Sequence, residues 1–218
     1  MLFRSTCSGA YKFLLEHGVI PTHHVESDPR PHKAKMLGQP HAAVDYLVAS
    51  IIHPDYLDVL EQNHVLDNTT LFHILFFESE ILRLIPPNEW ISTGGNTAGG
   101  RAIKLARMMG FTNHHYFGFD ITTGYAATHL KLGSAQDDTK IAGTVDVHCN
   151  GKVFKSMDFW VEQAEMTFED LDRMPEVRFQ FHGEGLMQEM AKIRKPVKRT
   201  ALPMGVYRDE QAYQCGIR

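Results

Sequence analysis

Segments of strand character alternate with segments of helix character along almost the whole chain, and this alternation limits the possible folds more than any other feature. Apolar, β-branched runs bounded by turns predict strands, and apolar residues three or four positions apart predict amphipathic helices. Strands are expected over residues 22–26, 44–50, 69–77, 90–92, 114–119 and 177–181, and helices from near Ser8 to Gly18, from Pro54 to Asn63, from the glycine loop to Gly110, after Ser156, and over 186–193. The sequence therefore predicts an α/β, Rossmann-like fold, with a mostly parallel sheet covered by helices on both faces.

The segments between these elements contain one further strong signal. Residues 144–148 and 152–156 flank Asn150-Gly151, a pair that accepts positive φ at both turn positions, so we expect a β-hairpin there. Ser156 is the expected cap of the helix that follows, and the stretch from Pro29 to Pro40 is expected to be a loop. One domain over residues 1–195 and an extended tail over 196–218 complete the predicted organisation.

The composition narrows the classes of partner. The 218 residues carry 43% hydrophobic and 22% charged side chains, typical of a soluble globular chain, and a net charge of −4 argues against a general electrostatic grip on nucleic acid or on a membrane surface. Three widely spaced cysteines support neither a disulfide framework nor a zinc knuckle. No apolar run approaches the ~18 residues of a membrane span. We expect a cytoplasmic protein that binds a nucleotide or nucleotide sugar and forms, as one option, a homodimer.

Ligands of open parallel sheets bind outside the carboxyl ends of the strands. This rule selects candidate residues without any motif. They are Asp28, Ser50, His53, Ser92, Thr93, Asp120, His182 and Glu184. We expect the fold to bring them to one edge of the sheet.

A glycine-rich loop from Gly94 to Gly100 precedes a predicted helix and also contains Asn96, Thr97 and Gly99. Free N–H groups and the positive end of the helix dipole suit such a turn to phosphate binding, and absent side chains let an anion approach. The spacing is neither the dinucleotide pattern nor a P-loop, because Gly100-Arg101 stands where Lys-Ser/Thr belongs. The alternative is that Gly94, Gly95 and their neighbours serve only a tight turn and close packing of the helix on the sheet.

Two carboxylates, Asp28 and Asp120, each end a predicted strand. There a carboxylate can hold Mg²⁺ beside a phosphate, accept a ribose hydroxyl or act as a base, and the alternative is a loop cap such as an Asx-turn. His182 and Glu184 lie between glycines at the last strand end and suit acid/base work, although Glu184 equally fits the first turn of a helix. Zinc is not expected, because the histidine doublets alternate across strand faces and no zinc spacing is present.

Several short motifs resemble one known family. They are Ser8–Pro21, Glu26-Ser27-Asp28-Pro29, Tyr46–Ser50 with His53-Pro54, Gly94-Gly95-Asn96-Thr97, and Gly118-Phe119-Asp120. Together, over about residues 5–193, they are similar to the 6-hydroxymethylpterin diphosphokinase-like family. Its relatives include archaeal pterin diphosphokinases and the motility accessory factors thought to glycosylate flagellin with nonulosonic acids, and its core is similar to that of bacterial sialyltransferases.

The resemblance implies a Rossmann-like domain that binds a nucleotide donor, with the family's glycine loop on Gly94 to Gly99 and its acidic positions on Asp28 and Asp120. Family members usually begin with a further strand and a Gly-Pro-Ser-like turn before the first helix, and this chain is expected to start too late to contain them. Either the chain is a shortened descendant or the turn from Ser5 to Gly9 does the work of that loop.

Three functions follow as hypotheses. The first is a nucleotide-dependent transferase like the pterin diphosphokinases, in which the glycine loop and Thr97 hold phosphate, Asp120 and Asp28 bind Mg²⁺ or ribose, and His182 assists proton transfer. The second is a sialyltransferase-like transfer of a sugar without a metal. The third is a nucleotide-binding or assembly protein that catalyses nothing.

Overall fold

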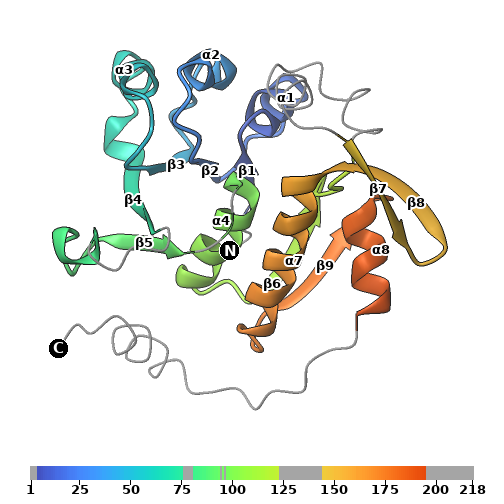
Figure 1. Ribbon diagram of the computed structural model, residues 1–218. Helices are drawn as coiled ribbons and strands as arrows, with labels where there is room; N and C mark the ends of the chain where they lie inside the picture. Colours follow the sequence, from blue (N-terminus) through green and yellow to red (C-terminus); the bar gives the residue numbers. More distant parts are fainter. Residues whose placement is uncertain (1–3, 76–80, 94, 96, 123–143, 195–218) are drawn as a thin grey trace.

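A computed structural model describes residues 4–75, 81–93, 95, 97–122 and 144–194 of the chain (Figure 1). The expected tail over residues 196–218 and the end of the strand expected over 69–77 lie outside these residues. Among the described residues, no helix combines the length and the apolar character that crossing a membrane requires.

Five parallel strands form the main sheet, in the order in which they occur along the chain. They are β1 (Ser5–Cys7), β2 (His23–Glu26), β3 (Asp45–Ala49), β4 (Thr69–Leu75) and β5 (Trp90–Thr93). The helices α1 (Ala10–Glu16), α2 (His32–Leu37) and α3 (Pro54–Gln62) lie on one face, and α4 (Ala98–Met108) lies on the other (Figure 1). Short 3₁₀ turns, η1 (Leu66–Asn68) and η2 (Ile81–Leu84), precede β4 and β5. The predicted α/β, Rossmann-like fold is confirmed.

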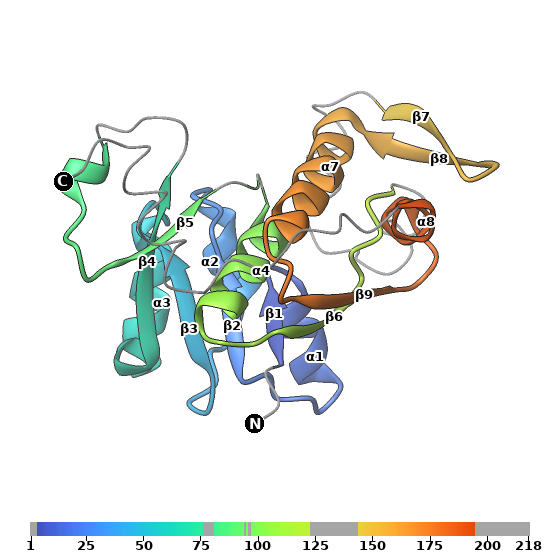
Figure 2. The same cartoon turned by 90° about the horizontal axis from the view of Figure 1, so that it is seen from below.

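The later strands form two separate small sheets. β6 (Asn113–Phe117) pairs in parallel with β9 (Arg178–His182), and β7 (Thr144–Cys149) pairs antiparallel with β8 (Lys152–Met157). The helices α7 (Asp158–Asp172) and α8 (Leu186–Ile193) accompany them. β6 and β9 lie on the side of the main sheet where β1 is the edge strand (Figures 1 and 2). In the described part of the chain, no ladder joins β6 to β1, so the parallel strands are divided between two sheets.

The prediction that no strand precedes the first helix is wrong. Residues Ser5–Cys7 form β1, which pairs with His23, His24 and Val25, so a strand does precede the first helix. A three-residue strand is too short to show alternation, which explains why sequence patterns missed it. Ser8, with φ of 48°, and Gly9 make the turn into α1, which begins at Ala10 without a side-chain cap.

The stretch from Pro29 to Pro40 is not all loop, because α2 occupies His32–Leu37. Its six residues cover fewer than two turns, and Pro31 takes the N-cap position, so the stretch resembles a proline-rich loop in sequence. Ser156 does not cap α7: it lies in β8 and its hydroxyl donates to the Ile121 carbonyl at 2.9 Å. Met157 is the residue at the N-cap, with no side-chain cap.

The hairpin prediction is confirmed in detail. Asn150 and Gly151 both have positive φ, of 52° and 74°, as a two-residue turn of the primed type requires. Glu189 of α8 holds the turn in place, because its carboxylate accepts from Asn150 Nδ2 at 2.8 Å and from Lys152 Nζ at 2.7 Å. The hydrogen bonds from Lys152, Lys192 and Asn150 lower the pKa of Glu189 to about 2.

Three apolar clusters make the core. One lies between the main sheet and α1 to α3, and includes Tyr11, Tyr46, Tyr56 and Leu60. A second lies on the α4 face of that sheet, with Val25, Leu47, Phe72 and Leu105. The third packs α4 and α7 on the β6–β9 sheet, with Ile103, Phe168, Phe181 and Met187 (Figure 2). Because α4 contributes Leu105 to one cluster and Ile103 to another, it joins the two sheets.

His24 lies buried within the first of these regions. Its ring packs 4.7 Å from Tyr11, and its Nδ1 lies 3.0 Å from the Thr6 hydroxyl. Burial, with the nearby charge of Lys33, lowers the pKa of His24 to about 3. The folded protein therefore keeps this imidazole neutral well below neutral pH.

We predict that His24 makes the fold acid-labile. Between about pH 6.5 and pH 3 the unfolded chain binds a proton at His24 and the folded chain does not, so the free energy of unfolding falls as pH falls through this window. Urea unfolding from pH 7 to pH 4 should give a steep slope for the wild type and a shallower one for His24→Gln. The exposed His17→Gln variant is the control and should keep the wild-type slope; an unchanged slope in His24→Gln would contradict the prediction.

Candidate functional site

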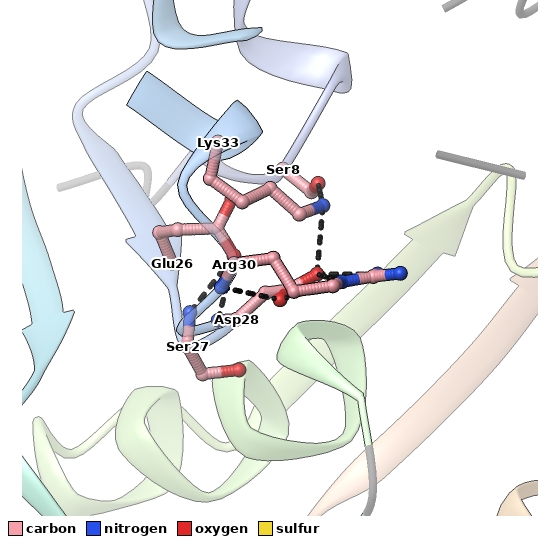
Figure 3. A network of polar contacts seen from close by, with 6 residues as sticks. All are labelled: Ser8, Glu26, Ser27, Asp28, Arg30 and Lys33. Carbon is pink, nitrogen blue, oxygen red and sulfur yellow. Dashed lines mark hydrogen bonds and ion pairs between the residues drawn. The ribbon is translucent and has the colours of Figure 1, made fainter. Parts of the chain in front are cut away.

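A polar cluster lies where β1 and β2 end (Figure 3). Lys33 of α2 points into it with a side chain only 4% exposed. Its Nζ donates to Ser8 Oγ at 2.6 Å and lies 3.3 Å from Asp28 Oδ2. Ser8 follows β1 directly and Asp28 follows β2, so Lys33 joins the ends of two neighbouring strands.

The Asp28 carboxylate binds both cations of this cluster. The Arg30 side chain donates from Nε to Oδ1 and Oδ2 at 2.9 and 3.0 Å and from Nη2 to Oδ2 at 2.6 Å. The backbone N–H of Arg30 also donates to Oδ1 at 3.0 Å, which closes an Asx-turn. Although burial raises the pKa of Asp28, these hydrogen bonds and the charge of Lys33 bring it down to about 2. At neutral pH Asp28 is an anion and a poor base.

Glu26 is a second carboxylate of the cluster, buried to 2% exposure at the end of β2. Its Oε1 accepts from the backbone N–H groups of Ser27 and Asp28 at 2.9 and 3.1 Å. Burial raises the pKa of Glu26, against the opposing charge of Lys33. Burial and the Glu26 charge also raise the pKa of the Cys7 thiol to about 12, so this thiol stays protonated at neutral pH.

The first turn of α4 lies beside this cluster. Cys7 at the end of β1 contacts the Ala98 carbonyl through its sulfur at 3.8 Å. Thr97 is the N-cap, and its Oγ1 accepts from the Gly100 N–H at 3.2 Å. Gly95 has φ of 68°, in the left-handed region that favours glycine. Of the predicted phosphate loop, Gly94 and Asn96 lie outside the described residues.

Two other residues of this loop have packing roles. A Cβ on Gly99 would run into the Phe119 ring, so the glycine permits a close approach of α4 to the segment after β6. Thr93 accepts from Lys104 Nζ through its carbonyl oxygen, and Lys104 also pairs with Asp170 of α7 at 3.0 Å. These contacts agree with the alternative interpretation of the loop, in which its residues serve close packing of the helix on the sheet.

Asp120 lies against the turn that joins β9 to α8. Its Oδ1 accepts from Gln188 Nε2 at 2.8 Å, and the same amide donates to the His182 carbonyl at 2.8 Å. A Cβ on Gly183 would lie 2.8 Å from Asp120 Oδ1, and one on Gly185 would collide with the Asp120 backbone. The glycines around Glu184 are therefore explained by their close approach to Asp120.

His182 ends β9 and has two aromatic neighbours. Its Nε2 lies 2.9 Å from His115 Nδ1, which forms a hydrogen bond between the imidazoles. Its ring stacks on Phe117 at 4.3 Å between centroids, with 6° between the planes. Neither neighbour was selected from the sequence, because cross-strand pairing between residues more than 60 positions apart leaves no local pattern.

The predicted site residues thus fall into two groups. The first group contains Asp28, Ser8 and Lys33, with the first turn of α4 beside them. The second group contains Asp120, His182 and the turn between β9 and α8. Within the described residues, no hydrogen bond or ion pair links Asp28 to Asp120, and the contact of Gly99 with Phe119 is the bridge between the groups. The other strand-end candidates have different surroundings. Ser50 Oγ forms a hydrogen bond with His73 Nδ1 at 2.9 Å, and His53 caps α3. The buried Ser92 hydroxyl has no hydrogen-bond partner among the residues that the structure describes.

Sequence reasoning missed the cations of the site. Arg30 follows Asp28 by two residues, a spacing that suits an ion pair across a turn, and this signal was available. Lys33 gave no signal, because its helix was interpreted as loop. Ser8 was predicted only as the start of the first helix and as part of the turn from Ser5 to Gly9, and Glu26 only as the end of a strand.

A comparison with protein families identifies a family whose model matches this chain. The model of the 6-hydroxymethylpterin diphosphokinase MptE-like family matches residues 5–125, more than half of the chain. The match begins at the first residue of β1 and ends after Asp120, so it includes Ser8, Lys33 and the α4 turn but stops before His182. No curated protein and no solved structure matches the chain.

We predict that Gln188 holds the second group together. Its side chain is buried, and its Oε1 accepts a hydrogen bond from the Gly185 N–H at 2.8 Å. Its Nε2 donates to Asp120 Oδ1 and to the His182 carbonyl. Gln188→Ala should lower the free energy of unfolding by about 2–4 kcal/mol, because each buried partner left unpaired costs about 1–3 kcal/mol. Urea unfolding measures this difference. Gln62→Ala, at an exposed helix end, is the control with a change within about 0.5 kcal/mol; equal effects of both substitutions would contradict the role given to Gln188.

Proposed function

The chain belongs to the 6-hydroxymethylpterin diphosphokinase MptE-like family, and on this premise we propose that it is a nucleotide-dependent diphosphokinase-like transferase. The reaction would move a diphosphate group from a nucleoside triphosphate to the hydroxyl of a small hydroxymethyl acceptor. The observation that carries the proposal is the buried Lys33 ammonium, held between Ser8 and Asp28 at the carboxyl ends of β1 and β2.

Diphosphate transfer needs positioned positive charge more than it needs a reactive side chain, because the transferred group and the leaving group are both anionic. Lys33 and Arg30 supply two cations, and the first turn of α4 supplies backbone N–H groups beside Cys7. Both cations are paired with Asp28 in the structure. A polyphosphate would compete with Asp28 for them, so in the proposal Asp28 keeps the two cations in place before the donor binds.

The remaining predicted residues keep the roles that their positions allow. The backbone from Thr93 to Gly99, with the Thr97 hydroxyl, would hold phosphate oxygens at the start of α4. Asp120 would accept a ribose or acceptor hydroxyl, because Gln188 holds its carboxylate in a fixed orientation. His182 would assist proton transfer at the acceptor oxygen, with His115 as its hydrogen-bond partner.

The described residues do not fit a Mg²⁺ ion held by Asp28. Both oxygens of that carboxylate are paired with Arg30 or Lys33, and Asp120 Oδ1 accepts a hydrogen bond from Gln188. Over the described ranges, no three His, Cys, Asp or Glu side chains are grouped so that they could hold a metal. The expectation of Mg²⁺ at Asp28 and Asp120 stays a prediction.

A second function is favoured by the same observation. A cluster in which two cations neutralise the carboxylate also suits a metal-free transfer of a sugar from a nucleotide sugar. The two functions differ in the donor and in the response to chelation, so one set of titrations separates them.

We predict that Lys33→Met weakens phosphate binding by about tenfold or more, because a charge-assisted hydrogen bond is lost. Calorimetric titration with tripolyphosphate and with ATP measures the change, and circular dichroism checks the fold. Lys35→Met is the matched control, since Lys35 lies on the same helix with an exposed side chain and should bind as the wild type does. Lys33→Arg should retain most of the affinity. Wild-type affinity in Lys33→Met would overturn the placement of the phosphates.

We also predict which donor supports turnover. Wild-type protein with ATP and 6-hydroxymethylpterin should release AMP, and Asp120→Asn and Gly95→Val should each slow this release. Release of CMP from a CMP-sugar in the presence of EDTA, without AMP release from ATP, would favour sugar transfer instead. Unchanged binding and turnover in both variants would show that the site is placed wrongly.

A further inference from the structure

The small parallel sheet has one face that the described helices leave open. Its register places Asn113 opposite Arg178, His115 opposite Gln180 and Phe117 opposite His182. Side chains alternate along a strand, so these six share a face. The opposite face carries Phe181 and Tyr116, which pack in the cluster formed with α4, α7 and α8.

Phe117 is the unusual residue of the open face, a phenylalanine with a relative exposure of 74%. Its ring is nevertheless oriented, because it stacks on the His182 imidazole at 4.3 Å with 6° between the planes. The His182 ring is held in turn by His115, whose Nδ1 lies at hydrogen-bond distance, 2.9 Å, from His182 Nε2. His182 therefore covers one face of the Phe117 ring, and the exposed surface of this ring is mainly its opposite face.

The position of this stack matters as much as its geometry. Phe117 is the last residue of β6 and His182 the last residue of β9, so both lie at the carboxyl edge where open α/β sheets bind ligands. Two residues beyond Phe117, the Phe119 ring touches Gly99 in the first turn of α4. The exposed ring is therefore three residues from Asp120, in a segment that touches the first turn of α4.

From these contacts we infer that Phe117, backed by His182, is the stacking platform for a planar heteroaromatic ring. The inference rests on the proposed function and adds the part of the ligand that the phosphate contacts do not hold. An aromatic ring fixed before binding loses little entropy when a second ring stacks on it. The platform is one ring wide, its nearest neighbours on the same face are the polar residues His115 and Gln180, and Asn113 and Arg178 lie farther along that face. Such surroundings suit a ring with hydrogen-bonding edges better than an apolar protein surface.

Two ligands of the proposed reaction carry such a ring, the base of the nucleotide donor and a pterin acceptor. Phe117→Ala and Phe117→Leu should weaken binding of whichever ring occupies the platform by about tenfold or more, the range found when a base loses its stacking partner. Phe117→Tyr should keep the wild-type affinity because it keeps the ring. Calorimetry with ATP, GTP and 6-hydroxymethylpterin, and quenching of pterin fluorescence, measure the effect.

Two controls make the test specific. Phe13→Ala removes another exposed phenylalanine that packs on a histidine, His17, at 4.2 Å on α1, and it should leave all affinities unchanged. Tripolyphosphate has no ring, so the Phe117 variants should bind it as the wild type does. A loss confined to ATP and GTP assigns the platform to the donor base, and a loss confined to the pterin assigns it to the acceptor.

The inference is overturned if Phe117→Ala binds every ring-bearing probe as tightly as the wild type, or if the wild type binds none of them. It is also overturned if the variant loses tripolyphosphate to the same extent, because the effect would then be structural. Failure of the proposed function has a different signature, the absence of tripolyphosphate binding to the wild type. The two outcomes are therefore distinguishable in one set of titrations.

Discussion

The buried ammonium of Lys33 is the interaction on which the arrangement of the N-terminal strands depends. A cation with a side chain 4% exposed is costly unless it is paired and hydrogen-bonded, and Ser8 and Asp28 meet both needs. Because Ser8 belongs to the turn after β1 and Asp28 to the loop after β2, satisfying the cation also sets the distance between those two turns. The short helix α2 carries Lys33, whose side chain points from this helix toward Ser8 and Asp28 (Figure 3).

Helix α4 brings the distant parts of the site together. The first five strands follow one another in order across the sheet, so a ligand edge made from them alone would be long and shallow. From the end of β5, α4 passes under the opposite face and contacts β1 and β2. Its first turn meets Cys7 on one side and Phe119 on the other. The turn after β1 and the segment after β6 become neighbours of one helix end by this route.

Much of the fold could be predicted from local chemistry, and the site much less. The Asn150-Gly151 turn requires positive φ at both positions, and β3 and α4 carry long apolar patterns, so each of these elements shows in the sequence. β1 has three residues and α2 has six, too few for either periodicity to be seen. Lys33 lies in α2 and Ser8 follows β1. Because these two elements are too short to be predicted, the roles of Lys33 and Ser8 in the cluster could not be predicted either. Asp28 and Asp120 were selected because strand ends are visible in the sequence, and the position of Arg30 two residues after Asp28 is a local signal as well. The partner of Asp120, Gln188, lies 68 residues away and depends on three-dimensional packing.

The division of the parallel strands into two ladders has a consequence for local opening. Strands joined by one hydrogen-bond ladder tend to open together. In the described residues, no ladder joins the β6–β9 pair to β1. The free energies of opening that amide hydrogen exchange detects are therefore set separately in the two sheets, with α4 as the element common to both. Loosening the first turn of α4 would lower protection on both sides at once, whereas fraying of the β6–β9 pair would leave the exchange of β2 and β3 unaltered.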